Sequence, residues 1–166
     1  FLKKKKNFGC KIEYSIEKSP LGTAGAIRNA IKNLSGESFL VINGDVITNI
    51  DLKKILKKPN TIAANELKTK FGTMKIKNNK ILKFNEKTDV ENVWMNPGLY
   101  HLSTDILKIL PHKGSLEAEI FPKLAKKKSL HTVKFKNVLW HSIDSFKDIE
   151  LSSQEINSKK YQKFFK

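Results

Sequence analysis

Apolar and polar side chains alternate with two different periods along the chain, and the changes of period mark the expected elements. Residues 10–20 alternate every second position, which predicts a strand. After a turn at residues 20–23, the pattern of residues 24–34 predicts a helix that ends at Gly36. Residues 39–42 are wholly apolar and rich in β-branched side chains, which predicts a buried strand.

The same rules divide the rest of the chain. Asp51 is a candidate cap for a short helix that stops before Pro59. The further expected elements are a strand at 60–67, a hairpin at 72–88 turning at Asn78-Asn79, a strand at 92–102 with a Pro-Gly interruption, helices from 103, at 115–127 and from 146, and strands at 129–135 and 137–143.

This succession of elements predicts an α/β fold. Strands alternate with helices in the first third of the chain, which is typical of a parallel sheet. The hairpin adds an antiparallel part, so we expect a mixed, mainly parallel sheet in a single domain, residues 1–166.

Composition excludes several classes of protein. No apolar run approaches the roughly 20 residues of a membrane span, and we expect a cytoplasmic protein without membrane partners. Cys10 is the sole cysteine, and the four histidines have no ligand-like spacing, which argues against disulfides and zinc.

A net charge of +16 raises the possibility of nucleic-acid binding. All but one of the 32 basic residues are lysines, the exception being Arg28, whereas nucleic-acid readers favour arginine forks and aromatic stacking. A bias towards A/T-rich codons is a sufficient cause of the lysine content. We therefore expect no nucleic-acid partner, although the positive field favours anionic substrates.

Three polar features lie where strands end, which is where ligands collect in open α/β sheets. The turn at residues 20–25 leads into a helix N-terminus, whose free N–H groups and glycines suit an anion or a polar ring edge, although it is also an ordinary strand-to-helix turn. Asp45 follows an apolar strand, either as a turn-stabilising residue or as a metal ligand. Asp144 follows another, either as a helix N-cap or as a second metal ligand.

These three stretches and four further motifs, all in order, resemble the sugar-1-phosphate nucleotidyltransferases. "SPLGTAGAIRNA" and "FLVINGDVITNIDL" carry the resemblance first. It continues through "FGTMKI", "FNEKT" (with Thr88 in place of the family's Pro), "NPGLYHL", "SLEAEIFPKLAKK" and "WHSIDSFKDIE". The resemblance covers about Lys11 to Glu150 and implies a Rossmann-like nucleotidyltransferase fold.

The resemblance also implies roles for individual residues. It assigns Asp45 and Asp144 to the binding of a magnesium ion (Mg²⁺) and counts both as catalytic. It assigns Leu21, Gly22 and Thr23 to the nucleotide base, with Asn43 or Gly44 beside the same pocket. It assigns Gly72, Glu86 and Asn96 to the sugar. Lys87, the third catalytic residue, is assigned to the sugar phosphate. Without the resemblance, Lys87 is a solvated lysine and Asn96 a turn residue before Pro97.

The implied activity joins a nucleoside triphosphate and a sugar 1-phosphate into a nucleotide sugar, with release of pyrophosphate, for cell-surface polysaccharide precursors. Homo-oligomers are a further expectation. The motifs leave base and sugar open, because "WHSIDSFKD" is closer to cytidylyltransferases and "PLGTAG" to guanylyl- and mannose- or heptose-type relatives.

One departure from the family bears on activity. Its opening strand and Gly-rich triphosphate loop have no counterpart here, and Phe1 is not a methionine. We therefore expect an N-terminally truncated fragment that lacks its first βαβ region and is inactive alone. The alternative function is a catalytically inactive sugar-nucleotide-binding module.

Overall fold

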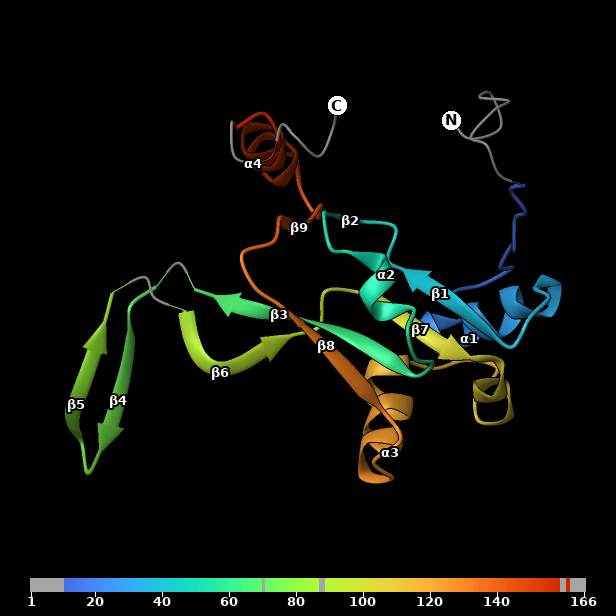
Figure 1. Ribbon diagram of the computed structural model, residues 1–166, viewed down its shortest axis with the longest axis horizontal. Coiled ribbons are helices and arrows are strands. Elements are labelled where there is room, and N and C mark those ends of the chain that lie inside the picture. Colours follow the sequence, from blue (N-terminus) through green and yellow to red (C-terminus); the bar gives the residue numbers. More distant parts are fainter. Residues whose placement is uncertain (1–10, 70, 87–88, 159–160, 162–166) are drawn as a thin grey trace. The chain divides into compact units, whose positions relative to one another are not determined.

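The computed structural model describes residues 11–69, 71–86, 89–158 and 161 (Figure 1). The chain divides into two compact units. The first unit comprises Phe1–Glu37 and Thr104–Ser129, and the second comprises Ser38–Ser103 and Leu130–Lys166. The chain therefore leaves the first unit after Glu37, builds most of the second, and returns at Thr104.

A five-stranded sheet forms the centre of the second unit. Its strands are β1 (Ser38–Ile42), β3 (Thr61–Lys68), β6 (Asp89–Met95), β7 (Leu99–Ser103) and β8 (His131–Phe135). Four of them follow the order β1-β7-β3-β6, and β8 pairs with β3 (Figure 1). The long strand β3 is thus the centre, contacting β6, β7 and β8.

The α/β class and the mixed sheet are confirmed, but the expectation of mainly parallel pairing is wrong. Among the described strands of this sheet only β3 and β8 pair in parallel, whereas β1–β7, β3–β7 and β3–β6 are antiparallel. Because β7 runs opposite to both β1 and β3, those two strands still point the same way. The alternation of strands and helices in the sequence therefore predicted that β1 and β3 point the same way, but it did not predict that β7 lies between them.

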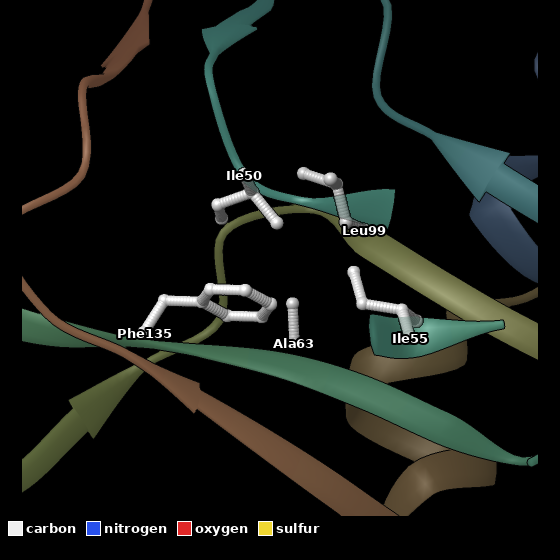
Figure 2. Packing of buried hydrophobic residues seen from close by; sticks show 5 residues of the cluster. All are labelled: Ile50, Ile55, Ala63, Leu99 and Phe135. Atoms are coloured by element: carbon white, nitrogen blue, oxygen red, sulfur yellow. The ribbon is translucent and has the colours of Figure 1, made fainter. Parts of the chain in front are cut away.

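The core of the second unit lies on one face of this sheet. Ile50, Ile55, Ala63, Leu99 and Phe135 form a buried apolar cluster in which the side chains point towards one another (Figure 2). The short helix α2 (Leu52–Ile55) contributes Ile55. Its predicted cap is confirmed, since the Asp51 carboxylate accepts the N–H of Lys53 at 3.0 Å.

Two small antiparallel ladders belong to the same unit. Strand β2 (Val46–Thr48) pairs with β9 (Trp140–Ser142), and β4 (Thr73–Lys77) pairs with β5 (Lys80–Asn85). The predicted turn of the β4–β5 hairpin is confirmed: Asn78 and Asn79 have φ angles of 48° and 59°. Asparagine tolerates this left-handed conformation, and two such residues define the hairpin turn that suits twisted strands.

Helices make up the first unit, and α4 (Phe146–Ile156) adds one to the second. The elements of the first unit are α1 (Gly22–Ala30), the 3₁₀ turns η2 (Ile31–Asn33) and η3 (Thr104–Lys108), the π-helical turn η4 (Leu116–Ile120) and α3 (Phe121–Lys126). Each lies where the sequence pattern predicts a helix.

A wide π turn changes the capping of η4. The Ser115 hydroxyl accepts the N–H of Ala118 at 3.1 Å, as a helix cap does. In the reciprocal bond, the Ser115 N–H donates to the Glu119 carboxylate at 2.9 Å. The two bonds form a capping box, in which the carboxylate lies four residues after the N-cap residue, one position later than in an α-helix.

The strand predicted within residues 10–20 is wrong. Residues 11–17, which the structure describes, form no strand, and the side chain of Ile16 is 80% exposed. A strand is stabilised by backbone hydrogen bonds to a neighbour, and no strand in the described part of the chain pairs with this segment. Alternation of side chains is thus insufficient without a partner.

No helix within the described residues combines the length and apolar character needed to cross a membrane.

The cluster around Leu99 predicts the outcome of a truncation. Leu99 is 1% exposed, so Leu99→Ala should lower the free energy of unfolding by about 2–5 kcal/mol through lost burial and a cavity. Ile81, 58% exposed on β5, offers a control: Ile81→Ala should change stability by about 0.5 kcal/mol or less. Urea denaturation of both variants checks this, and equal losses would contradict the assignment of the core.

Candidate active site

The β2–β9 ladder brings Asp45 and Asp144 to the same end of two strands. Val46 is opposite Ser142, and the N–H of Ile143 donates to the carbonyl oxygen of Asp45 at 2.9 Å. Asp45 is therefore opposite Ile143, and Asp144 is the next residue along. Both aspartates are exposed, so the predicted pair of carboxylates is gathered by backbone pairing at one edge.

The helix that follows does not use Asp144 as its cap. Ser145 is the N-cap of α4, with its hydroxyl accepting the N–H of Asp148 and donating to the Asp148 carboxylate at 2.7 Å. The same carboxylate accepts the N–H of Asp144 at 3.2 Å. The N-cap alternative for Asp144 is therefore wrong, and its side chain is left for another role.

The turn that carries Asp45 closes through the backbone. The N–H of Val46 donates to the carbonyl oxygen of Asn43 at 3.3 Å. Within residues 11–69, 71–86 and 89–158, the Asp45 carboxylate accepts no hydrogen bond and forms no ion pair. The turn thus does not depend on that carboxylate, which favours a ligand role over a turn-stabilising one.

The donor chemistry of this edge fits Mg²⁺. Carboxylate oxygens are hard ligands, and Mg²⁺ is commonly held by one or two carboxylates together with substrate phosphates and water. In the described part of the chain, no group of three or more His, Cys, Asp or Glu side chains could form an all-protein cage. Asp45 and Asp144 therefore suit a metal that is shared with phosphates.

The Pro-Gly interruption between β6 and β7 ties this edge together. The carbonyl oxygen of Gly98 accepts the N–H of Asn43, and that of Pro97 accepts the indole N–H of Trp140, both at 2.9 Å. Gly98 has a φ of +76°, and a β-carbon there would be 2.7 Å from Cγ of Asn43. Glycine is thus required both by the backbone conformation and by the Asn43 side chain.

Asn96 shapes the same junction. Its side-chain oxygen accepts the N–H of Gly98 at 3.0 Å, and its amide group donates to the Tyr100 hydroxyl at 2.8 Å. The turn role considered for Asn96 is therefore real. These two bonds also fix the orientation of the exposed Asn96 side chain.

Two of the predicted sugar-binding residues lie against each other. Gly72 precedes β4 and Glu86 follows β5, and a β-carbon on Gly72 would be 3.2 Å from Oε2 of Glu86. It would also be 2.9 Å from Cζ of Phe84. Because Gly72 has no side chain, the Glu86 carboxylate can lie against it. Lys87, the predicted phosphate ligand, lies outside the described residues.

A cleft of about 690 Å³ opens beside Asp144. Its walls include Trp140, Met95, Glu66 and Glu155. Of the predicted site residues, Asp144 alone is among those that line it. Sequence reasoning assigned no role to Trp140, which forms a wall here and anchors β9 to Pro97. Its position four residues before the strand-end Asp144 is the signal that could have found it.

The turn at Leu21, Gly22 and Thr23 lies in the first unit and is held by the loop before η4. The Gly114 N–H donates to the Leu21 carbonyl at 2.9 Å, and the Gly114 carbonyl accepts the Ala24 N–H at 3.0 Å. Gly22 has a φ of +71°, and a β-carbon would collide with the Gly114 carbonyl. The Ala24 N–H is thus already used, contrary to the expectation of free N–H groups.

Thr23 is tied to η4 by its side chain. Its hydroxyl donates to Glu117 at 2.7 Å and accepts the N–H of Leu116 at 2.9 Å. These contacts fix the shape of the turn. Because they occupy the Thr23 hydroxyl, the backbone of the turn and Leu21 are left for the predicted contact with a base.

Comparison with known proteins identifies the family. The family model described as nucleotidyl transferase matches residues 1–159, so the chain belongs to the nucleotidyl transferase family. The relatives include the D-glycero-alpha-D-manno-heptose 1-phosphate guanylyltransferase of Campylobacter jejuni, 36% identical over 116 residues, with 66% of this chain and 52% of the relative covered. They also include the mannose-1-phosphate guanylyltransferase catalytic subunit beta of Dictyostelium discoideum, 35% identical over 156 residues, with 86% and 43% covered.

A solved structure agrees. HddC from Yersinia pseudotuberculosis is 28% identical with a TM-score of 0.68, and the match covers 94% of this chain and 72% of that one. HddC in its complex with GMP-PN has a TM-score of 0.59, with 85% and 65% covered. The chain spans about half the length of the curated relatives it matches.

The paired aspartates predict a measurable metal affinity. Asp45→Asn and Asp144→Asn should each weaken Mn²⁺ binding, in the presence of GTP, by about tenfold or more, because each removes a charged ligand. Titration calorimetry measures this directly. Asp51→Asn is the matched control, since it makes the same charge change at a helix cap that asparagine also serves; the assignment is wrong if all three variants bind Mn²⁺ equally.

Proposed function

We propose that this protein contributes to nucleotidyl transfer from a nucleoside triphosphate to a sugar 1-phosphate, giving a nucleotide sugar and pyrophosphate. One observation carries the proposal: in a chain of the nucleotidyl transferase family, the β2–β9 ladder sets Asp45 and Asp144 at one edge, next to a cleft. Cytoplasmic location, a role in polysaccharide precursors and possible homo-oligomers belong to the same proposal.

The cleft suits a sugar phosphate in size and chemistry. Its volume of about 690 Å³ lies within the range of small-molecule sites, about 300–1,000 Å³. Carboxylates such as Glu66 and Glu155 accept hydrogen bonds from sugar hydroxyls, and Trp140 offers an apolar wall. The net charge of +16 favours the approach of an anionic substrate.

The reaction itself requires little from side chains. A phosphate oxygen of the sugar 1-phosphate forms a bond to the α-phosphorus, and the bond from that phosphorus to the departing pyrophosphate breaks. The nucleophile is already anionic, so positioning and charge neutralisation are the main tasks. Mg²⁺, when bound, would neutralise phosphate charge.

The chain's own residues divide these tasks. Asp45 and Asp144 would hold the metal ion. The resemblance assigns the sugar to Glu86 and Asn96 and its phosphate to Lys87. Of these residues, Asn96 directly follows Met95, which lines the cleft. The resemblance assigns the base to the turn at Leu21, whose shape is fixed within the first unit by Gly114.

Guanine is the base we propose. Relatives named for heptose 1-phosphate and mannose-1-phosphate share 36% and 35% identity with this chain, and both are named guanylyltransferases. A solved relative of 28% identity, HddC, has been crystallised in complex with GMP-PN. Heptose and mannose 1-phosphates are accordingly the first acceptors to test.

Pyrophosphate release tests the proposal. Because the chain spans about half the length of its curated relatives, the assay uses the whole protein. Given GTP, Mg²⁺ and mannose or heptose 1-phosphate, it should release pyrophosphate, and Asp144→Asn should lower turnover at least about a hundredfold, through several kcal/mol of lost transition-state stabilisation. Asp105→Asn, which changes an exposed aspartate in the first unit, should leave turnover unchanged.

Calorimetric titration with the same sugar phosphates separates the outcomes. Binding without turnover would favour the inactive sugar-nucleotide-binding module instead. Neither binding nor turnover with any triphosphate and sugar phosphate pair would contradict both functions.

A further inference from the structure

An asparagine lies on the core face of β3, at the point where the core meets the cleft of the candidate active site. Ala63 and Asn65 face the same side of the strand, because side chains alternate along it. Ala63 belongs to the buried apolar cluster, and Phe135 of that cluster is opposite Asn65 in the β3–β8 pair. Asn65 is 8% exposed and lines the cleft together with Met95, its partner on β6. The core face of β3 therefore ends in an amide group at the wall of the cleft.

Within the described part of the chain, one end of the Asn65 amide has a partner and the other has none. Its Oδ1 accepts the N–H of Glu66 at 2.9 Å, which identifies the oxygen end of the amide, since a nitrogen there would meet another donor. Its Nδ2 forms no hydrogen bond to a described residue. The unpaired side-chain atom that is fully buried in this part of the chain is Nε of Arg28. Nδ2 of Asn65 therefore keeps some accessible surface, and the cleft that Asn65 lines provides it.

Asparagine is an unfavourable residue for this position unless its amide binds something. It is depleted in strands, and a nearly buried amide donor without an acceptor destabilises the fold. The Oδ1 bond accounts for an acceptor at position 65, which an aspartate would supply equally well. A ligand atom that accepts a hydrogen bond from Nδ2 would account for the donor.

The charges around the cleft favour a neutral ligand group over a phosphate at this wall. The acidic lining residues are Glu66, Asp144, Asp148 and Glu155. The described lining has no lysine or arginine, and its histidine, His141, is paired with Glu155 at 2.8 Å. These carboxylates repel an anion that approaches without a metal ion. A hydroxyl group, in contrast, accepts from an amide and donates to a carboxylate at the same time.

Glu66 supplies a carboxylate next to Asn65. Its side chain is 13% exposed, and it lines the same cleft. Its Oε1 is paired with Nζ of Lys136 at 3.2 Å, and Lys136 also lies over the ring of Trp94. This contact holds the carboxylate and leaves Oε2 without a partner among the described residues. The β3–β6 register shifts directly after Glu66, and such irregularities redirect side chains, so two consecutive residues of one strand can line one cleft.

We propose that Asn65 is a specificity-determining residue of this cleft: its Nδ2 donates to one hydroxyl of the sugar, and that hydroxyl donates to the Glu66 carboxylate. The inference rests on the nucleotidyl transfer proposed above, and it extends that function to two residues that the family resemblance leaves without a role. A sugar that lacks this hydroxyl leaves both protein groups unpaired. Sites built in this way reject such an analogue far more strongly than an apolar pocket does.

The side-chain amide of Asn65 gives a readout that needs no turnover. In a ¹H–¹⁵N spectrum of the whole protein, its NH₂ signals are those missing from Asn65→Asp, a variant whose carboxylate still accepts the Glu66 N–H. Titration with mannose 1-phosphate or heptose 1-phosphate should shift these signals saturably, whereas inorganic phosphate should not. Signals that move with neither sugar phosphate, or that move equally with inorganic phosphate, would overturn the proposal.

Steady-state kinetics of Asn65→Asp provide the second measurement. The variant should raise the KM for the sugar 1-phosphate about tenfold or more and leave the KM for GTP unchanged, because one hydrogen bond to the sugar is lost. Asn79→Asp is the matched control, since it adds the same charge at an exposed hairpin turn that aspartate also tolerates. It should behave as the unaltered protein does.

Mannose 1-phosphates that each lack one hydroxyl separate the hydrogen bond from the added charge. The unaltered protein and Asn65→Asp should use one of these analogues equally poorly, because the contact is absent from both pairs. The same loss with every analogue would mean that the charge alone acts, and would overturn the proposal. Asn65 signals that respond to a sugar phosphate without any turnover would contradict the proposed nucleotidyl transfer and support this contact, so the two failures are distinguishable.

Discussion

The carbonyl oxygens of Pro97 and Gly98 hold the two strand ends that lead to the candidate active site. Gly98 accepts from Asn43, two residues before Asp45, and Pro97 accepts from the indole of Trp140, four residues before Asp144. Both bonds depend on the break between β6 and β7, where Gly98 takes a φ of +76°. The strand ends that carry both aspartates are therefore held at one junction, the break between β6 and β7.

Each unit uses its glycines and polar side chains to fix loops. In the first unit, Gly22 packs against Gly114 while Thr23 binds Glu117 and Leu116, so the turn expected to meet a base is shaped before any ligand arrives. Preorganised loops on a rigid scaffold are what positional catalysis requires. This geometry is consistent with the proposed nucleotidyl transfer.

The features that could be predicted from the sequence are those that depend on residues close together in the chain. The strand that becomes β1, the Asn78-Asn79 turn and the aspartates at strand ends follow from short-range patterns. The insertion of β7 between β1 and β3 depends on which strands pair, and side-chain periods carry no such information. Likewise Asp144 and Ser145 are equally good caps by residue type, and only the position of Asp148 selects Ser145.

A crystal structure grown with Mn²⁺, a sugar 1-phosphate and a non-hydrolysable GTP analogue tests the central claim most directly. The account predicts an anomalous Mn²⁺ peak within ligand distance of a carboxylate oxygen from both Asp45 and Asp144, with the sugar phosphate in the cleft beside Trp140. A metal ion bound elsewhere, or aspartate side chains that diverge around the β2–β9 ladder with both ligands present, would contradict it.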